Sequence, residues 1–91
     1  MVAYTLNKNY IKTSASGQDY IKSEVIGYYG SIESAAKGIK LSLFEYILKN
    51  KLVGKKLEDA KNNKILVRQR LTDANYISHP IFFYNEIIIK D

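Results

Sequence analysis

The stretch "VIGYYGSIESAAKGI", residues 25–39, marks the place where an extended segment gives way to a helix. Downstream of Ser31, apolar residues keep the three-and-four spacing of a helix that packs on a sheet. They are Ile32, Ala35, Ala36 and Ile39. Gly30 can turn the chain, and the Ser31 hydroxyl can accept a hydrogen bond from a free amide of the first helical turn. We therefore predict that Gly27, Gly30 and Ser31 form a structural joint between a strand and a helix.

A bound anion gives the same joint an alternative interpretation. Gly27 and Gly30 allow a close approach to the backbone, and the amides that follow Ser31 begin a helix, where anions bind readily. A turn and a helix cap account for the same residues without a ligand. The joint is therefore the first interpretation and a phosphate site the second.

A hairpin is expected before the joint. Residues 2–12 mix β-branched and aromatic residues with asparagines, and they predict a strand with an irregularity near residues 7–9. Residues 20–29 alternate between apolar and polar residues and predict a second strand. Between them, "TSASGQD" at residues 13–19 concentrates the small and polar residues that permit a reversal of the chain.

Tyrosine dominates the aromatic residues, since the chain has eight tyrosines and no tryptophan. Strict alternation along the second strand would place Tyr20 and Tyr28 on one face together with Lys22. Aromatic and basic side chains on an open sheet can stack bases and contact phosphates, and they can equally anchor a protein interface. Tyrosine is also a common residue of any half-covered sheet.

The main helix is predicted over residues 32–49. Besides its sheet-facing residues it carries a second apolar stripe, formed by Leu41, Phe44 and Leu48. The last turns are thus apolar around much of their circumference. We expect either another element of the chain or a partner to cover this second stripe.

The second half of the chain has less regular patterns. Gly54 breaks the helical pattern, and residues 56–63 predict a shorter second helix. Residues 64–71 fit either a helix or a strand, and we favour the strand. Residues 72–80 predict a loop.

The last residues, "IFFYNEIIIKD" at 81–91, predict a final strand. Together these elements predict an α+β fold, in which a small antiparallel sheet of the N-terminal hairpin and the C-terminal strand packs on one main helix of about 18 residues and a shorter second helix. With 91 residues and 46% hydrophobic content, residues 1–91 are expected to form a single domain.

The residue inventory argues against catalysis and metal binding. The chain has no cysteine and one histidine, His79, whose only neighbouring acid in sequence is Asp73. Glu58 and Asp59 are adjacent, so on a helix they point about 100° apart instead of forming a carboxylate pair. No phosphate-binding loop, nucleophile elbow or metal-ligand spacing occurs. We expect no enzyme activity, no cofactor and no metal.

The N-terminus "MVAYTLNKNY" has no apolar core that could serve as a signal peptide. The apolar runs elsewhere are too short for a membrane-spanning helix. We expect a cytoplasmic protein.

The formal net charge of +5 is concentrated in the middle of the chain. Residues 37–70 contain ten basic and three acidic residues, whereas the rest of the chain has four basic and six acidic ones. Such a segment suits a polyanion or an acidic protein surface, and it equally suits a solvated helix. The candidate binding residues for protein or nucleic acid are Lys49, Lys51, Lys55, Lys56, Arg68, Arg70, Tyr20, Tyr28 and Phe44.

The opening stretch also carries a resemblance. A hairpin followed by "GYYGS", by "IESAAKGI" at the start of an apolar helix and by "KKLEDA" resembles small uncharacterised proteins of phages and prophages of low-GC bacteria, over residues 4–62. The resemblance implies an accessory protein that acts on host defence or on host nucleic-acid machinery, for example an anti-CRISPR type inhibitor.

A second resemblance is to the modular DNA-binding segments of homing endonucleases. It is carried by "SIESAAKGIKLS" and "YILKNKLVGKK". It implies a helix-turn-helix with a turn directly after Ile39, where Lys40 stands in this chain. An uninterrupted helix through Lys40 would exclude that arrangement.

Three hypotheses of function cover these observations. The first is a binding protein that modulates a host protein or a nucleic-acid-processing complex. The second is a small basic DNA- or RNA-binding domain, in which Lys and Arg contact phosphates and Tyr20 or Tyr28 stacks on bases. The third is a homo-oligomer formed through residues 81–89, because an exposed strand this apolar invites pairing with a second copy.

Overall fold

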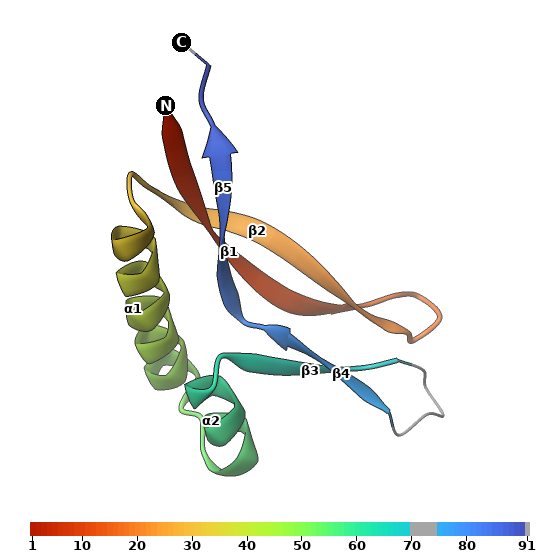
Figure 1. The fold of residues 1–91 in the computed structure, drawn as a ribbon. Coiled ribbons are helices and arrows are strands. Elements are labelled where there is room, and N and C mark those ends of the chain that lie inside the picture. Colours follow the sequence, from red (N-terminus) through yellow and green to blue (C-terminus); the bar gives the residue numbers. More distant parts are fainter. Residues whose placement is uncertain (70–74, 91) are drawn as a thin grey trace.

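The computed structural model describes residues 1–69 and 75–90. Its elements follow in this order along the chain (Figure 1): β1 (Val2–Thr13), β2 (Asp19–Tyr29), α1 (Ile32–Asn50), α2 (Gly54–Lys61), β3 (Lys64–Arg68), β4 (Tyr76–Pro80) and β5 (Phe82–Ile88). β1 is the centre of an antiparallel sheet with β2 and β5, while β3 and β4 form a separate two-stranded ribbon. The predicted α+β fold is confirmed, with the hairpin and the C-terminal strand in one sheet.

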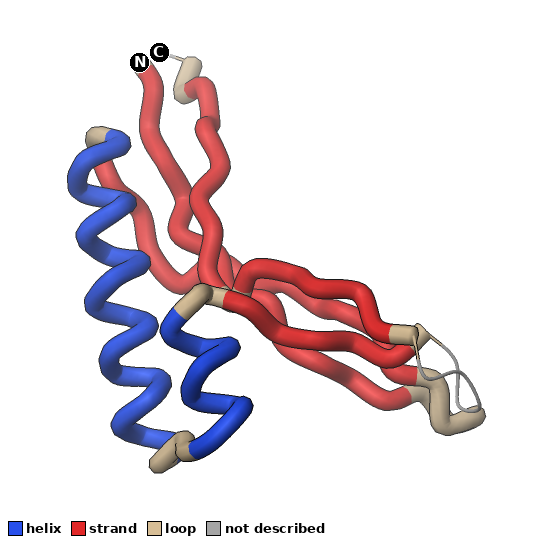
Figure 2. Tube along the Cα trace, turned by 60° about the horizontal axis from the view of Figure 1, so that its bottom comes forward, coloured by secondary structure: helices blue, strands red, loops and turns tan. Residues whose placement is uncertain are grey.

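The main helix packs along one face of the three-stranded sheet (Figure 1). The hydrophobic core between them contains Leu6, Ile81, Phe82 and, from α2, Ala60. The β1–β2 hairpin extends well beyond α1, and the β3–β4 ribbon runs beside this overhanging part (Figure 2). Among the described residues, no helix has the length and apolar character needed to cross a membrane.

The joint between β2 and α1 is built as a cap and a close contact. Ser31 is the N-cap of α1, and its Oγ accepts a hydrogen bond of 3.1 Å from the Ser34 amide. The Tyr29 ring reaches the helix at Gly38, which is buried. A Cβ at Gly27 would lie 3.3 Å from Cε2 of the same ring. Gly27 and Gly38 therefore make room for Tyr29, whereas a Cβ at Gly30 would have nothing within 4 Å.

The pairing of β1 with β2 is interrupted by a bulge. Leu6 pairs with Gly27 and Asn7 pairs with Val25, so Ile26 is an extra residue on β2. Such a residue shifts the register by one and reverses the faces of the bulged strand beyond it. The irregularity predicted near residues 7–9 of the first strand is present as a register shift between Leu6 and Asn7, but its extra residue lies on β2 and not on β1.

The bulge separates two tyrosines that strict alternation places together. Tyr20 pairs with Lys12 and Tyr28 pairs with Thr5. Lys12 and Thr5 are an odd number of residues apart on β1, so their side chains lie on opposite faces of the sheet. The expectation that Tyr20 and Tyr28 share a face is wrong for this reason, although Tyr20 does share its face with Lys22.

A corner at Ile81 divides the C-terminal segment into β4 and β5. The buried Ile81 donates its N–H to the carbonyl oxygen of Asn63 (3.2 Å) and to Oδ1 of the same residue (3.1 Å), and its own carbonyl accepts from the Asn9 amide (2.8 Å). The Asn63 side chain also accepts from the Phe82 amide (2.9 Å) and donates to the Phe82 carbonyl (2.8 Å). Asn9 Nδ2 donates to the Pro80 carbonyl over 2.8 Å. Two asparagines distant in sequence thus fix the corner.

This corner explains the errors in the C-terminal prediction. The loop expected at 72–80 is wrong where β4 stands, because Tyr76–Pro80 pairs with β3 and gains a strand partner that the local sequence does not reveal. The strand favoured for 64–71 is confirmed over Lys64–Arg68. The final strand predicted for 81–91 is shorter than expected, since β5 begins only after the corner. Residues 70–74 and Asp91 lie outside the described residues.

Both helices differ slightly from expectation. α2 begins at Gly54, two residues before the predicted start, and ends at Lys61. α1 runs without a break through Lys40 and ends one residue after the predicted end. The helix-turn-helix that the second resemblance implies needs a turn after Ile39, and the continuous α1 leaves no such turn.

Candidate binding surfaces

The solvent side of α1 carries three large apolar side chains. Leu41, Phe44 and Leu48 have 65%, 62% and 59% of their surface exposed, and we call these three residues the outer stripe. They are spaced by three and four residues, so they lie on one side of the helix. Ala35 and Gly38 are buried on the side that meets the sheet. Among the described residues, no other element covers the outer stripe.

Basic residues surround the outer stripe. Lys37 precedes Leu41 by four residues, and Lys40 precedes Phe44 by the same interval, so each lies one helical turn away on the same side. Lys51 is the left-handed C-cap of α1, with a φ of 50°. All three lysines are exposed. Glu45, four residues after Leu41, is exposed beside the stripe as well, so the apolar anchors have a mainly basic margin with an acid on the side of the cleft.

Four of the predicted basic residues come together at the turn between the helices. Lys49 is in the last turn of α1, Lys51 caps it, and Lys55 and Lys56 are in the first turn of α2. Lys55 forms an ion pair with Asp59 (2.9 Å) on the exposed surface, where such a pair contributes little to stability. This cluster is one part of the predicted binding set.

The remaining predicted residues lie elsewhere. Arg68 ends β3 beside the tip of the β1–β2 hairpin, where Gln18 Nε2 donates to the Arg68 carbonyl over 3.3 Å. Tyr20 lines the same region, whereas Tyr28, 71% exposed, lies on the opposite face of the sheet. Arg70 lies outside the described residues. The predicted set is thus distributed over separate surfaces of the fold.

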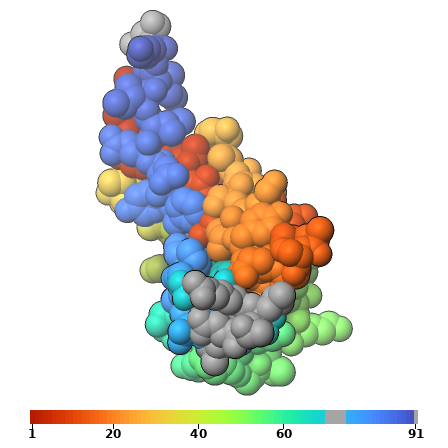
Figure 3. All heavy atoms as spheres, turned by 90° about the vertical axis from the view of Figure 1, so that its right-hand side faces the viewer, coloured from red at the N-terminus to blue at the C-terminus, as the bar shows by residue number. Residues whose placement is uncertain are grey.

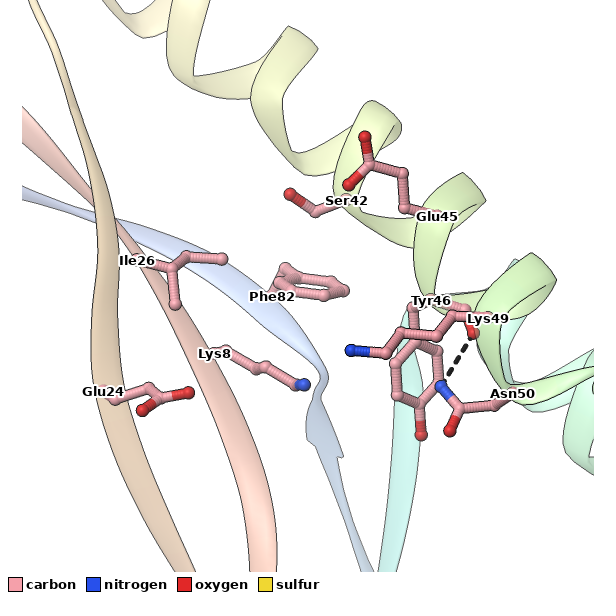
Figure 4. Close-up of a pocket in the computed structure, with 9 residues that line it drawn as sticks. All are labelled: Lys8, Glu24, Ile26, Ser42, Glu45, Tyr46, Lys49, Asn50 and Phe82. Carbon is pink, nitrogen blue, oxygen red and sulfur yellow. Dashed lines mark hydrogen bonds between the residues drawn. The ribbon is translucent and has the colours of Figure 1, made fainter.

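A cleft of about 380 Å³ opens between the second half of α1 and the sheet (Figure 4). Lys8 from β1 and Lys49 from α1 point into it, and Lys8 Nζ lies 5.5 Å from the centre of the Tyr46 ring. Glu24, which pairs with Lys8 across the strands, and Glu45 also line the cleft. Two bases and two acids give it no net charge.

Lys8, Lys37 and Lys40 were not in the predicted set, whereas Lys51 was. A signal for Lys8 exists in the sequence, because it follows the core residue Leu6 by two positions on β1 and so faces the helix. The signal for Lys37 and Lys40 is their spacing of one helical turn from Leu41 and Phe44.

The final strand is an edge strand. β5 pairs with β1 and, within the described part of the chain, with no second strand. Tyr84 and Ile88 on this strand are 40% and 77% exposed. Strand edges of this kind offer unpaired backbone groups to another chain.

No group of three or more His, Cys, Asp or Glu side chains in residues 1–69 and 75–90 is placed to hold a metal ion. Comparison of the chain with protein-family models, with curated proteins and with solved structures finds no match. The surfaces described above are the observations from which a function is argued.

Proposed function

We propose that the chain is a non-enzymatic accessory protein, of the kind used by phages and mobile elements, which binds a host protein or a nucleic-acid-processing complex and modulates it. The observation that carries this proposal is the outer stripe of α1. Large apolar side chains exposed in a continuous row on a helix are characteristic of protein interfaces. The partner would be a protein with an apolar groove.

The spacing of the outer stripe suits helix-in-groove recognition. Leu41, Phe44 and Leu48 present anchors at positions i, i+3 and i+7, which fill successive pockets of a groove. Complete burial of one such side chain contributes about 1.5–3 kcal/mol before the entropic cost of association. Three such anchors therefore contribute substantially to the binding free energy. Polar contacts at the margin of the stripe must supply the rest.

The charge around the stripe supports an acidic rim on the partner. Lys37, Lys40 and Lys51 would face carboxylates at the edge of the groove, which accelerates association and orients the helix. An anti-defence role follows from the resemblance of this chain to phage accessory proteins. Inhibition of a nuclease complex is the specific form of that role.

Photo-crosslinking tests the proposal. Benzoylphenylalanine in place of Phe44 should trap a protein in lysate of a low-GC bacterium, and the same probe in place of Tyr28 should not. Tyr28 is a matched control because it is 71% exposed and lies on the sheet face away from α1. The trapped protein is then purified and bound to the unmodified chain.

Two results support the proposal together: direct binding of the purified protein, and a weaker affinity for Lys37→Glu/Lys40→Glu. Equal trapping at both positions would mean that the stripe is not selective. Trapping of a second copy of this chain alone would assign the stripe to a homodimer. Either result would overturn the proposal.

A further inference from the structure

The overhanging part of the β1–β2 hairpin carries tyrosines and lysines in an alternating arrangement. Tyr10 pairs with Lys22 and Lys12 pairs with Tyr20, so each ring has an ammonium group across the strands and another two residues along its own strand. All four side chains share one face, because they stand at alternate positions of paired strands. We call Tyr10, Lys12, Tyr20 and Lys22 the ribbon face.

The ribbon face is open to solvent. Lys12, Lys22 and Tyr20 are exposed, the last by 42%, and Tyr10 is half-buried. Ile21, on the opposite face of the hairpin, is half-buried and lines a cleft with Val67 and Ile77 of the β3–β4 ribbon, and Tyr20 lines the same cleft beside its exposed surface. Figure 3 shows this end of the hairpin, in orange, as a flank of the molecule separate from the upper projection formed by β5.

Contacts within the hairpin place Lys12 over a tyrosine ring and engage the nearby Asp19 carboxylate in a hydrogen bond. Lys12 Nζ lies 5.7 Å from the centre of the Tyr10 ring. Asp19 accepts a hydrogen bond of 2.8 Å from the Thr13 hydroxyl. Along β1 in the other direction, the same face continues to Lys8, which shares its cleft with Lys49 (Figure 4). Glu24, which pairs with Lys8, and Glu45 line the same cleft, so the excess positive charge of this face belongs to Lys12 and Lys22.

We propose that the ribbon face binds single-stranded nucleic acid. Residues two apart on a strand are about 7 Å apart, and residues opposite one another are about 5 Å apart. In this alternation the tyrosine rings can stack on bases, and the lysine ammonium groups beside them can contact the phosphates between those bases. Stacking of one base on an aromatic side chain contributes about 1–3 kcal/mol and tolerates any base, so binding is expected with little sequence preference.

The combination of rings and charges favours single strands over other polyanions. The bases of a duplex are stacked on each other and cannot lie on Tyr20, so a duplex would use the lysines alone. An acidic protein segment would likewise need only the charges. The nucleic-acid site predicted from the sequence combined basic residues between Lys49 and Arg70 with Tyr20 or Tyr28. The ribbon face keeps Tyr20 but takes its positive charge from Lys12 and Lys22. The ribbon face lies away from the outer stripe, so a test of nucleic-acid binding there is independent of a test of the proposed function.

A single tryptophan can report stacking, because the chain contains none. Tyr20→Trp places the fluorophore on the ribbon face, and Tyr28→Trp places it on the opposite sheet face as a matched control. Each variant is titrated with twelve-residue oligo(dT) and oligo(U). We expect both oligonucleotides to quench the fluorescence of Tyr20→Trp and to leave that of Tyr28→Trp unchanged. The lower of the two dissociation constants, for oligo(dT) or for oligo(U), shows whether the ribbon face prefers DNA or RNA.

Two further variants separate stacking from charge. Tyr20→Leu should weaken oligo(dT) binding by about tenfold, the equivalent of a 1.4 kcal/mol stacking loss, while Tyr20→Phe should retain the affinity. Lys12→Gln should reduce the slope of log affinity against log salt by about 0.7, the value for one phosphate contact on a single strand. Circular dichroism of each variant checks that the hairpin is intact.

Three results would overturn this inference. The first is an absence of quenching of Tyr20→Trp by either oligonucleotide, and the second is equal quenching of Tyr28→Trp. The third is binding of a duplex or of polyglutamate as tightly as oligo(dT), with Tyr20→Leu as active as Tyr20→Phe. Tight binding of polyglutamate would assign the ribbon face to an acidic protein partner, and tight binding of the duplex would assign it to double-stranded nucleic acid. Phe44 variants that no longer bind a protein partner through α1 should still bind oligonucleotides as the wild type does. Failure of the proposed function can therefore be distinguished from failure of this inference.

Discussion

The end of the Tyr29 side chain packs directly on Gly38 of α1. A Cβ added at position 38 would lie 2.5 Å from the Tyr29 hydroxyl oxygen and 2.7 Å from Cζ. The two residues belong to the strand and the helix that the opening stretch joins. Tyr29 therefore fixes how closely α1 approaches the sheet, and Gly38 is the position that makes the approach possible.

Gly38→Ala should destabilise the protein despite the better helix propensity of alanine. Overpacking costs about 1–3 kcal/mol, and alanine offsets about 1 kcal/mol of that, so urea denaturation should show a loss of up to about 2 kcal/mol. In a Tyr29→Leu background, which removes the ring, the same substitution should become neutral or stabilising. Gly30→Ala is the control, since nothing lies within 4 Å of a Cβ there. An effect of Gly38→Ala on stability that is the same in the wild-type and the Tyr29→Leu backgrounds would refute the contact.

Asn63 should be the most sensitive polar residue of the fold. It holds the Ile81 corner through its side chain and has a positive φ of 57°. Asn63→Gly keeps the backbone freedom but loses the side-chain hydrogen bonds, and it should lower the free energy of unfolding by about 2–3 kcal/mol. Asn63→Ala should lower it by about 1 kcal/mol more through backbone strain.

Asn62→Ala is the matched control for the corner. Its side chain donates to the Glu58 carbonyl over 3.0 Å on the exposed surface, and its loss should change stability by less than about 0.5 kcal/mol. Equal effects of the substitutions at positions 62 and 63 would show that the corner does not depend on the Asn63 side chain.

Ser31→Ala should weaken the start of α1 by about 0.5–2 kcal/mol, because the Ser34 amide loses its acceptor. Ser34→Ala is the comparison, since it keeps the capped N–H and removes only the hydroxyl that accepts a hydrogen bond of 3.0 Å from Ser31 Oγ. The two variants are compared by thermal unfolding followed at a helix-sensitive wavelength. A larger loss for Ser34→Ala than for Ser31→Ala would contradict the cap.

The local patterns were sufficient to predict the hairpin, the helix start and the apolar stripe. Ser31, Ile32 and Ile39 carry this information in their spacing, and no distant contact is needed to interpret them. The register shift at Ile26 could not be predicted from the position of any one residue, because a bulge depends on which residue of the partner strand is skipped. The prediction that Tyr28 shares a face of the sheet with Tyr20 was wrong for that reason.

Long-range contacts decide the rest. Residues 76–80 become a strand through pairing with β3, and the chain turns at Ile81 because Asn9 and Asn63 bind its backbone from distant parts of the sequence. For the candidate surfaces, the sequence placed Phe44 in an apolar stripe but grouped it with basic residues that the fold separates. Pairing of β1 with β2 was needed to bring Tyr10 beside Lys22.

Phe44→Asp should leave the fold intact. The side chain is 62% exposed, so the substitution should lower the free energy of unfolding by less than about 1 kcal/mol. Chemical denaturation and circular dichroism measure this. A collapse in stability would mean that Phe44 belongs to the core and that the outer stripe is not free to bind.

The most direct measurement is the affinity of the partner trapped at position 44 for Phe44→Asp and Tyr28→Asp, determined by calorimetry beside the wild type. Loss of a central anchor costs about 2 kcal/mol or more. We expect the dissociation constant to rise by at least about 30-fold for Phe44→Asp and by less than about twofold for Tyr28→Asp. A Phe44→Asp protein that binds as tightly as the wild type would contradict the claim that the outer stripe of α1 is the binding surface.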